Sequence, residues 1–302
     1  MSSIAQKTYT ATTPLKVAFL GLGAMGYPMA GHLQRAGFDV TVYNRNPAKA
    51  QTWVEEFGGR STTNPSLAVQ GADIVLACVG NDDSLREVTY GENGAFQGMK
   101  IDSIFVDHTT TSAEVAKEVA AQAQARGLHF IDAPVSGGQA GAINGVLTVM
   151  CGGEESAFNR AKPVIDTFAR SVVLLGPHGS GQLCKMVNQI CIAGLVQGLA
   201  EAIAFGERTG LDMKQVLDVV SKGAAQSWQM ENRGPTMLQN KFDFGFAVDW
   251  MRKDLGLVFD EAKRNGAKLP VTELVDSFYA QIQANGNNRM DTSSLITLLK
   301  KA

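Results

Sequence analysis

One lysine in this chain, Lys185, lies in a stretch whose residue types could transfer a proton. It follows the glycine-containing segment Gly179–Cys184, and Asn188 and Gln189 come one helical turn later, so these side chains would share a helix face. A lysine ammonium group can give a proton to the alkoxide that forms when a carbonyl is reduced, and the free amine can take it back in the reverse direction. A lone helical lysine is more often a solvated surface charge, so this interpretation depends on what else the chain carries.

A second candidate site is the glycine-rich turn Gly21–Gly26 near the N-terminus. In a GxGxxG turn the first glycine permits tight chain reversal, the second lets backbone approach a pyrophosphate, and the third lets helix and strand pack closely. Here the turn follows the apolar run Lys16–Leu20 and opens a helix-compatible stretch. The N–H groups and dipole of a helix start also favour phosphate. A structural turn of the same sequence is the alternative, but this context favours a dinucleotide site.

The end of the second predicted strand, Val40–Tyr43, bears on which dinucleotide binds. NAD enzymes usually place an acidic residue there, to bind the ribose 2′-hydroxyl. This chain has Asn44, Arg45 and Asn46 instead, with Lys49 one helical turn later. Asn44 has no charge to repel a 2′-phosphate, and the guanidinium of Arg45 can bind one. The sequence therefore favours NADP (NADPH), with NAD as the weaker alternative, and a merely solvated Arg45 stays open.

The segment Asp132–Gly138 offers an anion-binding arrangement. It ends a predicted strand with Ser136, followed by Gly137 and Gly138. A hydroxyl group and two unencumbered backbone N–H groups could hold a carboxylate. Taken alone, these residues are more typical of a plain strand-to-loop turn.

The elements that must position these residues alternate between strands and helices in the first half of the chain. Such alternation predicts a parallel sheet covered by helices on both faces. After Gly179 the apolar spacing becomes helical. The sequence thus predicts an α/β fold, with a Rossmann-type doubly wound domain over residues 1–178 and an all-helical domain over residues 179–302. The predicted strands are Lys16–Leu20, Val40–Tyr43, Ile74–Val79, Ile104–Val106, Phe130–Ile131, Val146–Met150 and Val172–Leu175, and the predicted helices are Tyr27–Ala36, Ala113–Arg126, Gln182–Arg208, Met213–Lys222, Trp250–Asn265, Thr272–Gln283 and Ser293–Lys301.

Composition and charge argue against several classes of protein. With 302 residues, 45% of them hydrophobic and 19% charged, the chain can form two soluble domains. The net charge of −2 comes without a basic block, so we expect no nucleic-acid partner and no attraction to an anionic membrane. The start, Met1–Thr13, lacks the apolar core of a signal peptide. The most apolar segment, Ile190–Phe205, is interrupted by polar residues and is expected to be too short to span a bilayer.

The cysteines and histidines show no metal-ligand spacing, so we expect no metal site. The cysteines lie in apolar runs, which favours buried, reduced thiols and a cytoplasmic location. The residues concerned are Cys78, Cys151, Cys184 and Cys191, and His32, His108, His129 and His178.

Four motifs, in this order along the chain, resemble those of the β-hydroxyacid dehydrogenase family. That family includes 3-hydroxyisobutyrate dehydrogenase, tartronate semialdehyde reductase and the glyoxylate/succinic semialdehyde reductases. The resemblance extends from about Leu15 to Leu299, and the matching motifs are Gly21–Ala30, Asp132–Gly138 with Gly145–Thr148, Gly179–Asn188 and Lys253–Leu255.

The resemblance implies a role for each matching residue. Lys185 would be the catalytic acid/base, with Asn188 as its partner in orienting the substrate. The implied substrate-binding residues are Ser136, Gly137, Gly138, Thr109, Phe246 and Asp249. The resemblance also implies that Cys78 and Val79 line the cofactor through backbone, that Thr109 lies by the nicotinamide ribose, and that Lys253 closes over the cofactor. Together with the residues derived above, the predicted cofactor-binding residues are Gly21, Leu22, Gly23, Ala24, Met25, Gly26, Asn44, Arg45, Asn46, Lys49, Cys78, Val79, Thr109 and Lys253.

The chain also departs from the family pattern. Many members have Asn-Asn where this chain has Asn188-Gln189, which leaves the role of Gln189 open. Many have Leu-Pro where it has Val79-Gly80, which would allow a more flexible loop. The usual aspartate at the end of the second strand is Asn44, which again favours NADP.

The function that the resemblance implies is NADP-dependent reduction of a small carboxylate-bearing aldehyde, such as a semialdehyde or glyoxylate, to its hydroxyacid, and the reverse. Family members are commonly homodimers or homotetramers. Two alternatives stay open. One is a non-catalytic NADP-binding interaction module, although such relatives typically lose the lysine. The other is an imine reductase-like enzyme, although those depart from the lysine motif and the Ser-Gly-Gly turn, both of which are intact here.

Overall fold

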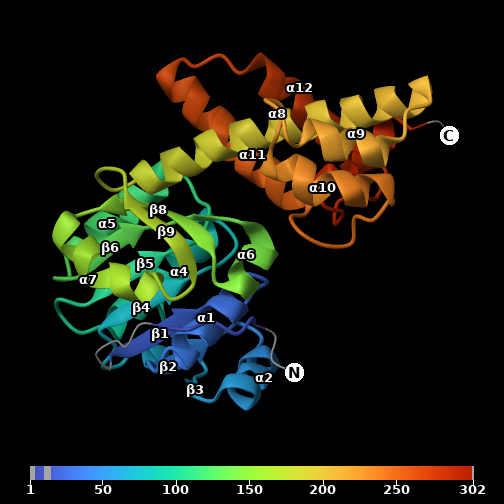
Figure 1. Ribbon diagram of the computed structural model, residues 1–302. Helices are drawn as coiled ribbons and strands as arrows, with labels where there is room; N and C mark the ends of the chain where they lie inside the picture. Colours follow the sequence, from blue (N-terminus) through green and yellow to red (C-terminus); the bar gives the residue numbers. More distant parts are fainter. Residues whose placement is uncertain (1–3, 10–14, 301–302) are drawn as a thin grey trace. The chain divides into compact units, whose positions relative to one another are not determined.

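Apolar runs in the first half of the chain pair into a nine-stranded sheet (Figure 1). The structure is a computed structural model that describes residues 4–9 and 15–300. The nine strands are those formed by these described residues. Their order is β3-β2-β1-β4-β5-β6-β8-β7, with β9 paired to β8. The strands are β1 (Lys16–Leu20), β2 (Asp39–Tyr43), β3 (Arg60–Ser61), β4 (Ile74–Ala77), β5 (Ile104–Asp107), β6 (His129–Asp132), β7 (Val135–Ser136), β8 (Leu147–Gly153) and β9 (Ala169–Leu174).

The first six strands are parallel, and their order 3-2-1-4-5-6 is that of Rossmann-type dinucleotide-binding folds. The two later predicted strands do extend the sheet, but β8 runs antiparallel to β6 and β7, and β9 runs parallel to β8. The expected parallel sheet is therefore a mixed one. The predicted strand at residues 74–79 ends at Ala77, so Cys78 and Val79 lie in the loop that follows.

Side chains of the central strands alternate between two hydrophobic layers. Val17 and Phe19 of β1 pack with the helices α1, α2 and α7, whereas Ala18 and Leu20 pack with α4 and α5 on the opposite face. This arrangement confirms the predicted doubly wound α/β fold (Figure 1). The helices are α1 (Gly26–Arg35), α2 (Pro47–Phe57), α3 (Pro65–Ala68), α4 (Asp82–Tyr90), α5 (Ala113–Gln124), α6 (Gly138–Asn144) and α7 (Glu155–Ile165), with a 3-10 turn η1 (Ala95–Gln97).

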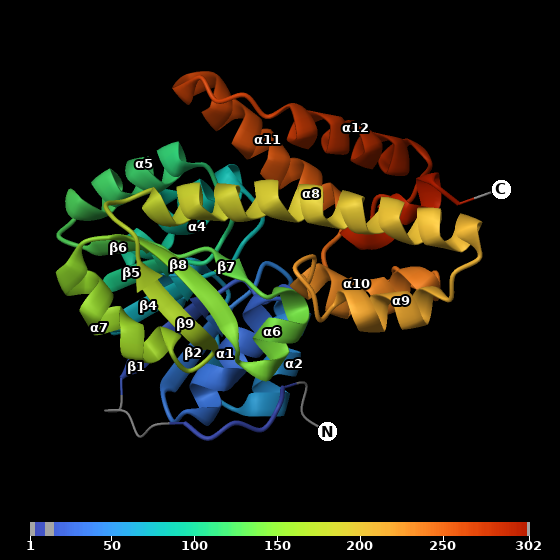
Figure 2. The same ribbon diagram turned by 45° about the horizontal axis from the view of Figure 1, so that its top comes forward.

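The remainder of the chain is helical, as predicted. The chain divides into two compact units after Lys185, inside the long helix α8 (Figure 2), and the domain boundary after residue 178 remains our proposal. Residues 292–298 form a 3-10 helix where the spacing predicts an α-helix. The structure adds the helix α10, which is not among the predicted helices and whose sequence contains Gly234 and Pro235, residues of low helix propensity. The elements are α8 (Ser180–Thr209), α9 (Met213–Val220), α10 (Trp228–Leu238), α11 (Val248–Asn265), α12 (Pro270–Ala284) and η2 (Thr292–Leu298).

The helix α8 corrects the prediction about the apolar segment. It has 30 residues and, by length and composition alone, one window of mean hydropathy 1.5 that could cross a membrane, so the segment is not too short. Half of that window is buried, and Ala193, Val196 and Ile203 belong to the hydrophobic core of the second unit. A core helix of a soluble protein has these same properties, and a single helix of this kind is weak evidence for a membrane span.

The four thiols are free, but their burial differs from the expectation. Cys151 is buried, Cys78 and Cys184 are half-buried, and Cys191 is exposed. Cys191 is exposed because it lies on the face of α8 opposite the core residues, four positions after the exposed Val187.

Candidate functional site

The glycine-rich turn connects β1 to α1, at the point where the strand order reverses between β1 and β4. Gly21 has a φ of 94°, and a Cβ added there would lie 2.4 Å from the carbonyl oxygen of Cys78. A Cβ on Gly26 would lie 2.0 Å from the carbonyl oxygen of Gly21. A Cβ on Gly23, in contrast, would meet nothing within 4 Å. Two glycines are thus required by the fold itself, while the middle one leaves open space beside the backbone, which fits a pyrophosphate.

The neighbouring residues of this turn contribute mainly through the backbone. Leu22 is buried in the sheet core, and its N–H donates to Oδ1 of Asn44 at 2.9 Å. Met25 precedes α1 as its N-cap, and Ala24 is exposed. No side chain caps α1, but the N–H of Tyr27 donates to the carbonyl oxygen of Gly23 at 3.1 Å and Pro28 has no N–H, so the N–H of Gly26 is the one that the first three residues of the helix offer to an anion.

The residues after β2 divide into two roles. The Nδ2 of Asn44 donates to the carbonyl oxygen of Asn46 at 3.0 Å, and Oδ1 of Asn46 accepts from the N–H of Ala48 and caps α2. These two asparagines therefore shape the turn. Arg45 and Lys49 are exposed, and within residues 4–9 and 15–300 neither side chain forms a hydrogen bond or an ion pair. Both cations are thus available to bind a phosphate.

The loops after β4 and β5 meet at the same edge of the sheet as the glycine-rich turn. The N–H of Val79 donates to Oγ1 of Thr109 at 2.9 Å, and the N–H of Cys78 donates to the carbonyl oxygen of Leu20 at 2.9 Å. The structure therefore brings together Cys78, Val79 and Thr109, all of which are predicted to line the cofactor.

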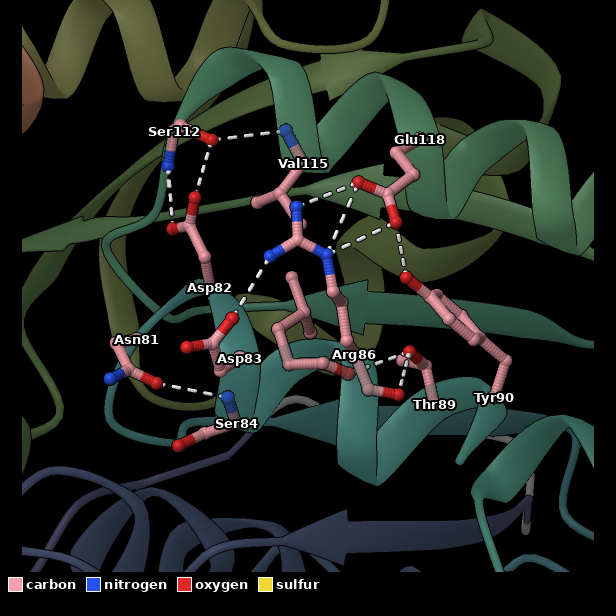
Figure 3. A network of polar contacts seen from close by, with 11 residues as sticks. Asn81, Asp82, Asp83, Ser84, Arg86, Thr89, Tyr90, Ser112, Val115 and Glu118 are labelled. Atoms are coloured by element: carbon pink, nitrogen blue, oxygen red, sulfur yellow. Dashed lines mark hydrogen bonds and ion pairs between the residues drawn. The ribbon is translucent and has the colours of Figure 1, made fainter. Parts of the chain in front are cut away.

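A network of polar contacts joins α4 to α5 and to the loop before α5 (Figure 3). The carboxylate of Asp82, at the start of α4, accepts from the N–H of Ser112 at 3.0 Å and from its hydroxyl group at 2.6 Å. Ser112 in turn caps α5, since its Oγ accepts from the N–H of Val115 at 3.0 Å. One helical turn further on, Arg86 pairs with Glu118 across the same two helices at 2.8 Å. The loop from Thr109 to Ser112 is therefore fixed at both ends.

The predicted carboxylate-binding turn lies between β7 and α6. Ser136 ends β7, while Gly137 and Gly138 have φ values of 125° and 60°. Residues with a side chain rarely adopt such φ values, so both glycines are required by conformation. A Cβ on Gly138 would meet nothing within 4 Å. The backbone here is therefore open, as the predicted role requires.

Lys185 lies in the first turns of α8 and is 7% exposed. The start of this helix is held by two buried residues, Asp132 and Gln182, for which the sequence predicts no role. Oδ1 of Asp132 accepts from the N–H of Gly179 at 2.7 Å, and Oδ2 accepts from the N–H of Gln182 at 3.1 Å. Burial raises the pKa of Asp132 to about 6, although both N–H donors act to lower it. The only sequence signal for these residues was their place inside the two motifs.

His108, the histidine next to Thr109 in the sequence, is held by the protein backbone. His108 is buried, its Nδ1 donates to the carbonyl oxygen of Ala133 at 2.7 Å, and burial lowers its pKa to about 4. A neutral His108 cannot act as an acid at neutral pH. Within the described part of the chain, no group of three or more His, Cys, Asp or Glu residues is placed to hold a metal ion.

In the second unit, four polar side chains form a chain from α8 to α11. The Nδ2 of Asn188 donates to Oε1 of Gln189 at 2.8 Å, and Nε2 of Gln189 donates to Oδ2 of Asp254 at 2.7 Å. The Nζ of Lys253 lies 3.0 Å from Oδ1 of Asp254. Asp254 is 2% exposed. Gln189, whose role was open, thus connects the predicted substrate-orienting Asn188 to the carboxylate that pairs with the predicted cofactor-binding Lys253.

The other predicted residues of the second unit have partners of their own. The N–H of Phe246 donates to Oδ2 of Asp291 at 2.9 Å, which fixes its backbone. The two carboxylate oxygens of Asp249 accept from the side-chain amides of Gln283 and Asn288, each at 2.6 Å. Asp249 therefore joins α11 to the end of α12 and the loop after it, whereas Asp254 is the carboxylate beside Lys253.

Comparison with protein families matches both parts of the chain. Residues 16–176 match the model described as the NAD-binding domain of 6-phosphogluconate dehydrogenase. Residues 179–299 match the model described as NAD-binding of NADP-dependent 3-hydroxyisobutyrate dehydrogenase.

Individual relatives extend over almost the full length of the chain. An uncharacterized oxidoreductase of Shewanella frigidimarina is 61% identical over 95% of this chain and 99% of its own length. The 2-hydroxy-3-oxopropionate reductase of Escherichia coli is 33% identical, over 95% of this chain and 97% of its own. The structure of Mycobacterium tuberculosis 3-hydroxyisobutyrate dehydrogenase with L-serine is 31% identical, with a TM-score of 0.86, over 96% of this chain and 100% of that one.

Proposed function

The chain belongs to the family of NAD(P)-dependent 3-hydroxyacid dehydrogenases, and on this basis we propose that it interconverts a small carboxylate-bearing aldehyde and its 3-hydroxyacid with NADP(H). The names of the relatives support the substrate class. Both 2-hydroxy-3-oxopropionate and L-serine carry a carboxylate at C1 and oxygen at C3, as an aldehyde in the first and as a hydroxyl group in the second. They differ at C2, so we propose that the site tolerates different C2 substituents.

The observation that carries the proposal is the placement of Lys185. It follows directly after a helix start that is hydrogen-bonded to the ends of β5 and β6, beside the loop of Thr109. When bound, NADPH supplies a hydride to the carbonyl carbon and becomes NADP⁺. Lys185 donates the proton of its ammonium group to the carbonyl oxygen, so that the aldehyde becomes the alcohol, and Lys185 takes the proton back in the oxidation.

The remaining residues bind and orient. We propose that the hydroxyl group of Ser136 and the N–H groups of Gly137 and Gly138 hold the substrate carboxylate. The proposed cofactor site comprises the open backbone of the turn Gly21–Gly26, the residues Asn44–Asn46 with Lys49, and the loop of Cys78, Val79 and Thr109. In the second unit, we propose that Asn188 orients the substrate, that Lys253 closes over the cofactor, and that Phe246 and Asp249 bind near the substrate.

We also propose a homodimeric or homotetrameric assembly in the cytoplasm. The helix α8 supports an assembly, because Val187, Leu195 and Phe205 are 60%, 45% and 70% exposed and follow one another on a single helix face. Free thiols support a reducing compartment.

The proposed carboxylate site predicts strong discrimination between acids and their neutral analogues. We expect kcat/KM for 2-hydroxy-3-oxopropionate to exceed that for its methyl ester by roughly 10- to 100-fold, which is the worth of charge-assisted hydrogen bonds to one group. The ester has nearly the same size and the same reacting aldehyde, so the comparison isolates the charge. The measurement is initial-rate kinetics at saturating NADPH.

Equal kcat/KM for the acid and the ester would contradict the carboxylate site while leaving the aldehyde chemistry intact. The same assay separates the alternatives. A non-catalytic NADP-binding module would bind NADPH and reduce neither compound, and an imine reductase-like enzyme would reduce a cyclic imine faster than either aldehyde.

A further inference from the structure

The side chain of Gln182 forms a bridge between the start of α8 and the loop that follows β5. Its Nε2 donates to the carbonyl oxygen of Thr109 at 2.8 Å, and its Oε1 accepts from the N–H of Thr111 at 3.0 Å. Gln182 is fully buried. Because one partner is an acceptor and the other a donor, the side chain must both donate and accept, which the amide of Gln182 does in this orientation.

The backbone of the same residue is held from another strand. The N–H of Gln182 donates to the carboxylate of Asp132 at the end of β6, and so does the N–H of Gly179. The strands β5 and β6 are parallel neighbours, with Asp107 paired to Asp132. The first turn of α8 is therefore fixed to the ends of two adjacent strands, by a carboxylate on one side and by the Gln182 amide on the other.

The loop at the far side of this bridge is itself fixed. Thr109 is held by the N–H of Val79, and Ser112 is held by Asp82 (Figure 3). Lys185 comes three residues after Gln182 on α8, which places it on the same side of the helix in the next turn. The two hydrogen bonds of Gln182 therefore fix the position of Lys185 relative to Thr109, in addition to stabilising the start of the helix.

We propose that Gln182 is a positioning residue that holds Lys185 at the distance from Thr109 at which its ammonium group reaches the carbonyl oxygen of the substrate. This inference rests on the proposed function. Gln182 neither binds the cofactor nor exchanges a proton; it acts through the position of α8. Its loss therefore changes the rate of the bound complex more than it changes the binding of NADPH.

The test compares Gln182→Met with a matched variant, Gln197→Met. Both residues are buried glutamines on α8, but the Nε2 of Gln197 donates to Glu201 on the same helix at 2.8 Å. Methionine preserves length and packing while removing both hydrogen bonds. We expect Gln182→Met to lower kcat by roughly 10- to 100-fold, the usual effect of a displacement of about 1 Å of a catalytic group. NADPH affinity, measured by fluorescence titration, should match that of the wild type, and Gln197→Met should retain wild-type kcat.

A second variant, Gln182→Glu, provides a readout that a merely structural residue would not give. When protonated, the introduced carboxyl group can donate to Thr109 and accept from Thr111, as the amide does. When ionised, it repels the carbonyl oxygen of Thr109. We therefore expect kcat of this variant to approach the wild-type value at low pH and to fall as pH rises. The wild type contains the same Asp132 and Lys185, so its own pH profile of kcat shows how much of the change comes from groups other than the introduced carboxyl group.

The possible results separate this inference from the proposed function. An active wild type with equal kcat in the two methionine variants overturns the role of Gln182 alone. So does a Gln182→Glu variant whose pH profile matches that of the wild type, and this measurement decides the matter if Gln182→Met fails to fold. A wild type that reduces no carboxylate-bearing aldehyde with NADPH overturns the proposed function and this inference together.

Discussion

Replacing Lys185 by alanine is expected to lower kcat by roughly 10²–10⁴-fold, the usual worth of a placed acid or base. The reason is that no proton donor would then reach the carbonyl oxygen while hydride arrives at the carbon. The variant should still fold and bind NADPH, because the glycine-rich turn is held by backbone contacts within the sheet, such as the hydrogen bond from the N–H of Gly21 to the carbonyl oxygen of Tyr43 at 2.8 Å. Steady-state kinetics, a fluorescence titration with NADPH and a thermal melt together measure the three quantities.

Two controls sharpen this prediction. Lys185→Arg should not restore the rate, because a guanidinium group holds its proton too tightly to exchange it near neutral pH. Lys214→Ala removes a lysine from the exposed face of another helix, where its side chain is 83% exposed, and should leave kcat unchanged. If Lys185 takes no part in proton transfer, its alanine variant would also keep near-normal turnover, and that outcome would overturn the proposed mechanism.

Replacing Arg45 by alanine is expected to raise KM for NADPH by the equivalent of about 1.5–3 kcal/mol, which is the worth of hydrogen bonds to a charged group. KM for NADH should change much less, because NADH lacks the 2′-phosphate. Arg45 is exposed and makes no side-chain hydrogen bond or ion pair within the described residues, so its loss should not affect folding. The measurement is kcat/KM for both cofactors with one aldehyde.

The matched control for Arg45 is Arg170→Ala. Arg170 is also exposed, but it lies on β9, which pairs with β8 at the opposite side of the sheet from β2. It should leave both cofactors unaffected. Equal losses with NADPH and NADH in Arg45→Ala would show that the arginine does not read the 2′-phosphate, and NAD would then become the favoured cofactor.

Features that depend on neighbouring residues in the sequence were predictable. The spacing of Gly21, Gly23 and Gly26 reflects local packing, because a Cβ at the first or third position would collide with backbone. The apolar run of β1 and the alternation of strands with helices along the chain predicted a sheet covered on both faces, and Val17 and Ala18 do belong to different hydrophobic layers. Local sequence patterns were therefore sufficient to predict the fold class.

Features that depend on contacts between distant residues were not predictable. The amide of Gln182 bonds to Thr109 and Thr111, and nothing in the local pattern around any of the three indicates that partnership. The same holds for Gln189 and Asp254, whose side chains meet across two helices. Cys191 was expected to be buried because its neighbours are apolar, but on a helix the neighbours of an exposed residue point elsewhere.

We propose that hydride passes from NADPH to the aldehyde carbon of a carboxylate-bearing substrate. The most direct test uses NADPH carrying deuterium at C4 of the nicotinamide, in both stereochemical forms, with 2-hydroxy-3-oxopropionate and the purified wild type. We expect a 3-hydroxyacid product with one deuterium at C3, seen by mass spectrometry, from only one of the two labelled cofactors. A product without label from either cofactor, or no reduction of the acid at all, would contradict it.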